Sequence, residues 1–248
     1  MSNKLLKAIN DGLAFSEKLI AYSQGKGYGS HAVKQEVKQA VKLLRRKINL
    51  AVDVGGNVGN YSAELRALDP NIEIHVFEPS SVNIVKLRER FQLDQRVFLV
   101  NHALSNVVGS AVLHSNESGS GLASLSKRDL EHLDIPFEFA ESVPVTTFDN
   151  YWRSTLFKRP IDLVKIDIEG HELNALEGFG ESLTVTRLVQ FEFGGCNIDT
   201  RTFFHDFWKF FQKRGFKIFR VTPFGVLPIG KYSEKLEFFS TTNYYALK

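Results

Sequence analysis

The sequence predicts an α/β fold with a mostly parallel, seven-stranded sheet and helices on both of its faces. From Ile48 onward, short apolar runs alternate with segments of helical periodicity, which is typical of parallel strands joined by helices. The last apolar run, 239–247, follows the run 216–221 without an intervening helix. The sheet should therefore end in an antiparallel hairpin.

An N-terminal helical extension, residues 1–47, precedes the main domain, which we assign to residues 48–248. The extension is helical in pattern and is interrupted at the glycine-rich segment 25–29. Its second half carries an apolar stripe among lysines and arginines, and we interpret the basic side as a solvated face. The extension is expected to pack over the cofactor cleft or against a partner subunit, which would allow a homodimer through these helices.

The elements of the main domain follow from its periodicity. Strands are predicted at 48–54, 72–77, 96–100, 161–167, 186–193, 216–221 and 239–247. Helices are predicted at 59–68, 81–91, 171–179 and 201–214. Residues 105–150 interrupt the alternation with short strands at 110–114 and 142–146 around a Gly/Ser-rich loop. An insertion beside the carboxyl ends of the strands is well placed to act as a substrate lid.

A glycine-rich turn after the first strand predicts a nucleoside-bearing cofactor. The turn, residues 55–59, is preceded by Asp53, and the second strand ends at Glu78, where such folds place the carboxylate that accepts from ribose hydroxyls. Asn57 replaces the middle glycine of the dinucleotide fingerprint, and an acid ahead of the turn repels pyrophosphate. An acid at this position suits the ammonium group of S-adenosylmethionine better than it suits the pyrophosphate of a dinucleotide. A P-loop is excluded because its sequence pattern does not occur.

Composition narrows the class of protein further. The chain has 248 residues, a net charge of +3 and a single cysteine, so we expect neither nucleic-acid binding, nor an internal disulfide, nor a cysteine metal cluster. No apolar run approaches the roughly 20 residues that cross a bilayer, and no signal-peptide core is present. We therefore expect a cytoplasmic protein without a transmembrane segment.

Acidic residues gather at the ends of two later strands. Segment 163–172, LVKIDIEGHE, delivers Asp167 and Glu169 to the edge where ligands bind in such sheets, and Glu192 lies in the next strand. A carboxylate there can take the proton of an acceptor hydroxyl; the competing interpretation is that Asp167 or Glu169 caps the following helix. Lys165 lies in an apolar strand and requires a carboxylate partner, for which Glu192 is one candidate. With Asn197 the acids offer oxygen ligands, but their spacing identifies no metal site, and none is expected.

Six segments in order resemble the FkbM family of S-adenosylmethionine-dependent methyltransferases. They are DVGGNVGNYS at 53–62, VFEPS at 76–80, NHALS at 101–105, GLASL at 121–125, LVKIDIEGHE at 163–172 and EF at 192–193. The resemblance implies the class I methyltransferase fold, S-adenosylmethionine as cofactor, and usually O-methylation of a hydroxyl on a sugar, a glycan or a secondary metabolite. Residues 1–47 lie outside it.

The resemblance also implies roles for individual residues. Asp53 and the glycine turn would hold the amino-acid end of the cofactor, Glu78 the ribose hydroxyls, and Asn101 to Ala103 the adenine. His102 stands where many class I methyltransferases have an Asp, and Gly56 replaces a common alanine, a change expected to be harmless. The full cofactor set is Asp53, Gly55, Asn57, Gly59, Tyr61, Ser62, Glu78, Pro79, Asn101, His102, Ala103 and Asp167. The catalytic set is Lys165, Asp167, Glu169 and Glu192.

Two other classes of function remain as alternatives. An NAD(P)-dependent oxidoreductase would share the nucleoside-binding unit, although the sequence has no dinucleotide fingerprint. A non-catalytic nucleoside-binding module would retain the nucleoside-binding pocket but would not catalyse a reaction. A small-molecule or glycan acceptor is the expected partner, and the sequence does not specify which hydroxyl is methylated.

Overall fold

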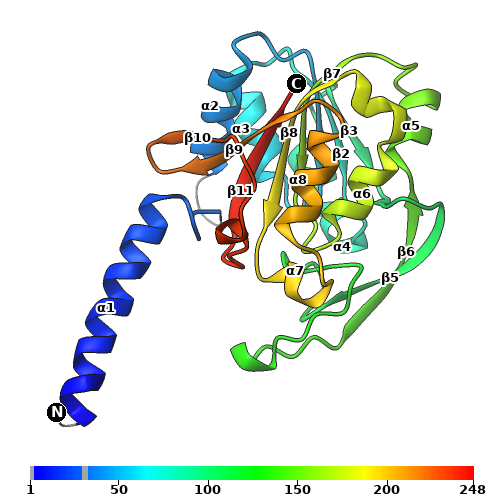
Figure 1. Ribbon diagram of the computed structural model, residues 1–248. Coiled ribbons are helices and arrows are strands. Elements are labelled where there is room, and N and C mark those ends of the chain that lie inside the picture. Colours follow the sequence, from blue (N-terminus) through cyan, green and yellow to red (C-terminus); the bar gives the residue numbers. More distant parts are fainter. Residues whose placement is uncertain (1–2, 30–32) are drawn as a thin grey trace.

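The computed structural model, which describes residues 3–29 and 33–248, is organised around one twisted sheet of eight strands (Figure 1). The strand order is β10-β9-β11-β8-β7-β1-β2-β3. The strands are β1 (Leu50–Val54), β2 (Glu73–Phe77), β3 (Val97–Val100), β7 (Ile161–Ile166), β8 (Thr186–Phe193), β9 (Lys217–Thr222), β10 (Gly225–Ile229) and β11 (Thr242–Leu247). The predicted α/β fold with a mostly parallel sheet is confirmed.

The sheet has a parallel part and an antiparallel end. Strands β3, β2, β1, β7 and β8 pair in parallel, whereas β11 is antiparallel to both β8 and β9. The predicted seven strands become eight, because β10 folds back antiparallel on β9 at the open edge. Pro228 lies in β10, and proline is tolerated there because an edge strand has one side without ladder hydrogen bonds.

Helices cover both faces of the sheet. One face is covered by α5 (Phe148–Ser154), α6 (Glu172–Gly178) and α8 (Phe204–Gln212), and the other by α2 (Val33–Leu44), α3 (Asn60–Leu68) and α4 (Ser81–Arg90). Alternate strand residues point to opposite faces: Leu50, Val52 and Val54 join the first core, whereas Ala51 joins the second. Asp53 therefore faces α2 and α3.

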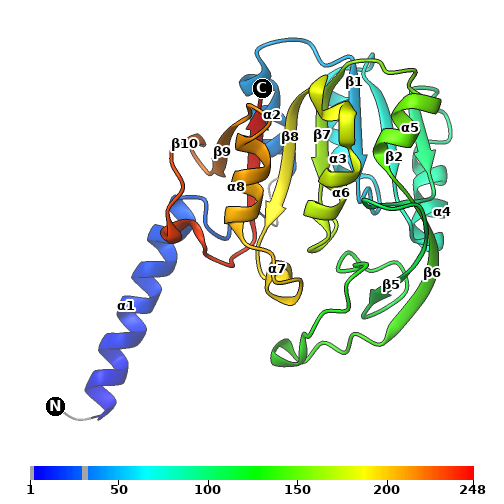
Figure 2. The same ribbon diagram turned by 45° about the vertical axis from the view of Figure 1, so that its right-hand side comes forward.

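Helix α1 (Asn3–Ser23) projects from this body instead of packing on it (Figures 1 and 2). None of its residues is buried, whereas α2 buries Val37, Ala40 and Leu44 against the sheet. The basic residues of α2 are exposed, as a solvated face predicts. None of the helices in the described part of the chain has the length and apolar character needed to cross a membrane.

A second, small sheet lies at the carboxyl edge of the large one. It consists of β4 (Ala103–Leu104), β5 (Gly109–Ser115) and β6 (Phe139–Thr146), in the order β4-β6-β5. Between β5 and β6 a long connection carries the short helix η1 (Glu131–Leu133), and Figure 2 shows it below the strand ends. The remaining short helices are η2 (Gly180–Thr184), α7 (Cys196–Asp199) and η3 (Glu234–Leu236).

Candidate active site

The glycine turn between β1 and α3 is shaped by close packing against the rest of the domain. Gly55 has φ of +78°, and a Cβ there would lie 2.0 Å from the carbonyl oxygen of Asp167. A Cβ on Gly56 would lie 2.2 Å from Val76 Cγ1. Glycine therefore fits at position 56, whereas an alanine would not, because Val76 occupies the space that its methyl group requires.

Glu78, at the end of β2, is fixed by the same turn. Its Oε2 accepts from the backbone N–H of Asn57 at 2.7 Å, and its Oε1 accepts from that of Ser80 at 3.0 Å. Asn101 donates to the carbonyl oxygens of Glu78 and Pro79, both at 2.9 Å. Asn101 thus supports the strand end instead of lining a cavity. Burial raises the pKa of Glu78.

A narrow cavity lies between Glu78 and the insertion. Its volume is about 50 Å³, and its lining joins Gly55, Asn57, Pro79, His102 and Ala103 to apolar side chains of the small sheet. The side nearest the insertion is formed by residues 120–125. Any larger planar group would therefore require this loop to move away from Glu78.

A much larger cleft opens on the other side of the glycine turn. Its volume is about 1130 Å³, and it lies at the carboxyl ends of β1, β7 and β8. The turn, Tyr61, Lys165, Asp167, Glu169 and Glu192 line it. Arg128 from the insertion and Glu36 from α2 complete the wall. Asp167 and Glu169 border both cavities, so the predicted catalytic acids meet the predicted cofactor turn.

Lys165, which lines the cleft, forms ion pairs with two acids. Its Nζ lies 3.2 Å from Asp167 Oδ2 and 3.6 Å from Asp53 Oδ1. Asp53 is fully buried, and its other oxygen accepts from the Ser62 hydroxyl at 2.6 Å. These carboxylates, not Glu192, are the partners of Lys165, and they raise its pKa despite the opposing effect of burial.

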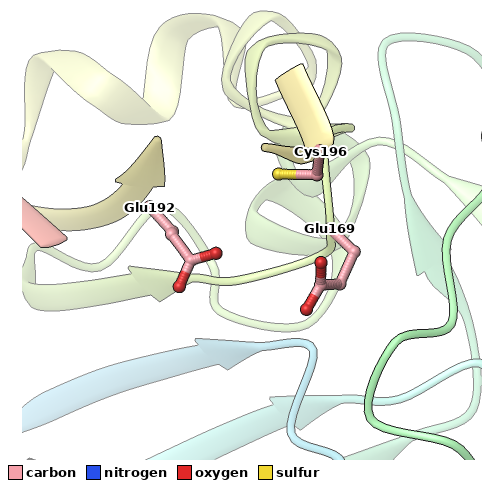
Figure 3. A group of neighbouring side chains, drawn as sticks. All are labelled: Glu169, Glu192 and Cys196. Carbon is pink, nitrogen blue, oxygen red and sulfur yellow. The ribbon is translucent and has the colours of Figure 1, made fainter. Parts of the chain in front are cut away.

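Glu169, Glu192 and Cys196 form a cluster on the wall of the cleft (Figure 3). Their donor atoms all lie within 4.8 Å of one another, close enough for a cation to be considered. Arg128 Nη1 lies 2.6 Å from Glu169 Oε2, and this guanidinium already supplies a positive charge to the cluster. The Cys196 thiol donates to Asn197 Oδ1, and burial raises its pKa.

The two carboxyl groups of this cluster hold protons unusually strongly. Burial, followed by repulsion from Asp167, raises the pKa of Glu169 to about 8. The same causes raise the pKa of Glu192. A carboxyl group that titrates near neutral pH can exchange a proton with a bound hydroxyl.

Two neighbouring polar residues have structural roles. Glu172 Oε1 accepts from the backbone N–H groups of Ile168 and Gly170, both at 3.0 Å, and thereby shapes the loop after β7. Asn197 Oδ1 accepts from Gly194 N–H at 2.9 Å. Glu169 does not cap α6, and its φ of +55° turns it out of the helical path toward Arg128.

Sequence reasoning missed Glu36 and Arg128. Glu36 is buried in α2, accepts from Gln190 at 2.8 Å and Asn243 at 3.0 Å, and has its pKa raised to about 7 by burial. One signal for it was an acid inside the apolar stripe of a lysine-rich segment. Arg128 lies in a connection without periodicity, so the sequence carried no comparable signal.

The chain's residues fit S-adenosylmethionine. Glu78 presents a buried carboxylate with capacity for ribose hydroxyls, and the turn borders both cavities, the larger of which is lined by several carboxyl groups. The strand order β3-β2-β1-β7-β8 of the parallel part places these groups together at the carboxyl edge of the sheet. Fold and site together define a class I S-adenosylmethionine-dependent methyltransferase.

Comparisons with known proteins identify the family. The chain belongs to the family described as the methyltransferase FkbM domain, whose model matches residues 53–218, more than half of the chain. A curated relative, 2-O-methyltransferase NoeI of Sinorhizobium fredii, is 26% identical over 196 residues, covering 75% of this chain and 80% of its own length.

Solved structures with a similar fold are more distant. Precorrin-6y C5,15-methyltransferase from Geobacter metallireducens is 13% identical with a TM-score of 0.46, over 89% of this chain and 93% of its own. An rRNA methylase from Streptococcus thermophilus is 12% identical with a TM-score of 0.48, over 88% and 97%. At these scores the neighbours carry no argument about substrate.

Proposed function

We propose that the protein transfers a methyl group from S-adenosylmethionine to a hydroxyl oxygen of a sugar, a glycan or a related small molecule. The observation that carries the proposal is the position of Glu169 and Asp167, which border both the glycine turn and the large cleft. Oxygen as the accepting atom is supported by the name of the relative, a 2-O-methyltransferase. The volume of about 1130 Å³ suits an acceptor larger than one small metabolite.

Glu169 is the proposed general base. When bound, the cofactor supplies an electrophilic methyl group, and the attacking hydroxyl must lose its proton as the new C–O bond forms. Arg128 holds Glu169 Oε2, which leaves Oε1 to accept that proton. A pKa of about 8 makes Glu169 basic enough for the task, and its ionised fraction, about a tenth at pH 7, increases above that pH.

Asp167, Lys165 and Glu192 are proposed to position the acceptor. Asp167 is partly exposed to the cleft, and its ion pair with Lys165 fixes its carboxylate as a hydrogen-bond acceptor for the hydroxyl. Glu192 faces the same space from β8 and, when protonated, offers a donor to a second acceptor oxygen. Lys165 acts through Asp167 and is a positioning residue.

The cofactor roles are proposed on the same geometry. Glu78 would bind the ribose hydroxyls, with His102, Ala103 and Pro79 beside the adenine in the narrow cavity. The turn from Gly55 to Gly59 would border the amino-acid end. Asp53 and Ser62 lie below the surface, so we assign them to holding Lys165 and the start of α3. Tyr61, which lines the large cleft, donates to Gln190 at 2.8 Å.

The proposed roles of the cofactor-binding and acceptor-binding residues agree with the proposed domain boundaries. Residues 48–248 would form the catalytic domain, with 105–150 as a lid whose Arg128 reaches across to Glu169 and Asp199. Residues 1–47 would add Glu36 to the cleft wall. Admission of an adenine would require residues 120–125 to move, which is consistent with a lid.

A cofactor-binding experiment comes first. S-adenosylmethionine at millimolar concentration should raise the melting temperature, because it binds the folded state alone. NAD at the same concentration should leave it unchanged. A shift with NAD and none with S-adenosylmethionine would favour an oxidoreductase and overturn the proposal.

An activity experiment separates the enzyme from a non-catalytic module. Transfer of labelled methyl groups is measured across a panel of mono- and oligosaccharides, and the Glu169→Gln variant is compared with the unaltered protein. The alternative, a non-catalytic binding module, would be supported if the protein binds the cofactor but transfers no methyl group to any panel member. It would then also release no S-adenosylhomocysteine in the presence of cell extract.

A further inference from the structure

Helix α1 exposes a broad apolar face that covers about half of its circumference and is interrupted by Gly12 and Ser16. At 100° per residue, Leu6, Ile9, Leu13 and Ile20 lie side by side, and Phe15 and Leu19 extend the same face. Their exposed fractions are substantial: Leu13 and Phe15 are each 65% exposed and Ile20 is 60% exposed. A face of this size requires an apolar environment, which residues 3–29 and 33–248 do not provide.

The base of α1 is anchored, so the direction of the helix is defined. Gly25 and Gly27 have φ of +90° and +78°, and a Cβ on Gly25 would lie 2.1 Å from the carbonyl oxygen of Val221. The Gly27 N–H donates to Thr242 Oγ1 at 3.1 Å, and the Gly29 N–H donates to the Thr241 carbonyl oxygen at 3.1 Å. The segment after α1 is thus attached to β9 and to the start of β11.

That anchor lies on the rim of the large cleft. Gly29 and Thr241, which bond to each other, both line it. Leu133 of η1 and Ile198 of α7 line it as well and are 56% and 60% exposed. Figures 1 and 2 show α1 extending beyond the same edge of the sheet at which η1 and α7 lie. The cleft mouth and the apolar helix therefore share one side of the molecule.

The polar half of α1 carries three lysines, Lys4, Lys7 and Lys18, and two acids, Asp11 and Glu17. A fourth lysine, Lys26, follows the helix in the anchoring segment. A helix with one apolar half and a lysine-bearing polar half is the pattern of helices that lie in the interface of a membrane. The lysines add attraction to anionic lipid headgroups.

We propose that α1 binds in the interfacial region of a membrane containing anionic phospholipids, with its apolar face toward the acyl chains. A second copy of the chain is the competing occupant. A pairing of two helices requires only a narrow apolar seam, whereas this face covers about half of the helix, and further exposed apolar residues line the cleft rim.

The membrane would then lie next to the cleft mouth. The helix is about 31 Å long at 1.5 Å per residue, and its anchor at Gly29 is itself part of the cleft rim. An acceptor attached to a lipid would reach the cleft without leaving the surface. Membrane binding does not depend on the proposed reaction, so its test uses binding as the readout.

The test is sedimentation of the full chain with lipid vesicles. Vesicles of phosphatidylcholine alone are compared with vesicles in which about a third of the lipid is phosphatidylglycerol, because anionic headgroups attract lysine side chains. We expect binding to the anionic vesicles, weakened by high salt, and at least tenfold weaker binding for Leu13→Glu. Ala14→Glu, the same charge on the polar half, is the control and should weaken binding less than threefold.

The variants leave the fold unaffected, because no residue of α1 is buried; an unchanged melting temperature verifies this. Equal binding by Leu13→Glu and Ala14→Glu would overturn the proposal, as would absence of binding by the unaltered chain. Light scattering completes the test: a dimer without vesicles that Leu13→Glu converts to a monomer would assign the apolar face to a second copy instead.

Discussion

Lys165 and Asp167 form an ion pair at the carboxyl edge of β7, with 3.2 Å between Nζ and Oδ2, in which both residues come from one strand end and face one cleft. The same ammonium group lies 3.6 Å from Asp53 and 3.4 Å from the carbonyl oxygen of Gly55. One cation thus connects the cofactor turn to the proposed acceptor site. Its removal should affect stability and cofactor binding together.

Replacement of Lys165 by methionine should lower the free energy of unfolding by about 3–5 kcal/mol, because Asp53 would be left buried without its counter-charge. Denaturant unfolding measures this. The double variant Lys165→Met with Asp53→Asn should recover a large part of the loss. A double variant no more stable than Lys165→Met would show that the pair is not what stabilises this region.

Methyl transfer should increase as the pH rises through about 8. Only ionised Glu169 accepts a proton, and its pKa is raised to about 8, so the active form accumulates above that pH. A pH–rate profile at saturating cofactor measures this. Glu169→Gln should reduce turnover by roughly 10²–10⁴-fold and remove the ascending limb. Retention of that limb in the variant would assign it to another group.

Arg128→Met should move the same limb to higher pH. The guanidinium lies 2.6 Å from Glu169 Oε2 and lowers the pKa of this carboxyl, so its loss leaves Glu169 protonated over a wider range. Lys127→Met, which removes an exposed charge next to it, is the control and should leave the profile in place. Similar shifts of the pH–rate profile in both variants would contradict a specific role for Arg128 and indicate that the loss of any nearby positive charge has this effect.

Stability should decrease with rising pH because of Glu36. Its pKa is raised by burial from 4.5 to about 7, so the folded state retains a proton that the unfolded state releases, and stability is lost between those two values. The loss from this group is about 2–4 kcal/mol. Denaturant unfolding at pH 4.5, 6 and 8 should therefore give a flatter dependence for Glu36→Gln. Parallel curves for the two proteins would contradict the prediction.

Gly56→Ala should cost about 1–3 kcal/mol of stability, because the added methyl group would collide with Val76. Gly230→Ala is the matched control, since nothing lies within 4 Å of a Cβ there, and it should change stability by less than about 0.5 kcal/mol. Val76→Ala combined with Gly56→Ala should recover part of the loss. Thermal unfolding of all four proteins measures the set.

The parallel half of the fold was predictable from the sequence because its strands are covered by helices on both faces and are therefore apolar throughout. Glycine and acidic residues mark the ends of these strands. Strand β10 was missed because an edge strand buries little: Val226, Leu227 and Ile229 are not buried, and Pro228 argues against a strand. Helix α5 was missed because it spans only residues 148–154, too short for a periodic signal.

The candidate site was predictable where it lies at strand ends and not where distant segments meet. Asp167, Glu169 and Glu192 follow from the rule that ligands bind at the carboxyl edge of a parallel sheet. The partners of Lys165 did not follow, because side-chain reach across β1 and β7 depends on register: Asp53 lies directly opposite Lys165. Arg128 reaches Glu169 from a loop that no periodicity describes.

Strand β11 has a consequence for how the protein is made. It lies between β8 and β9, and through Asn243 and Tyr245 it also holds Glu36 of α2. Residues near positions 30 and 240 must therefore meet before the cleft wall exists, which is a contact of very long sequence separation. During synthesis, the glycine turn and Glu78 emerge early, yet the wall formed by α2 must await residues 242–247. A ribosome-bound chain that ends before β11 should thus contain all of the proposed cofactor-binding residues but have no closed cleft.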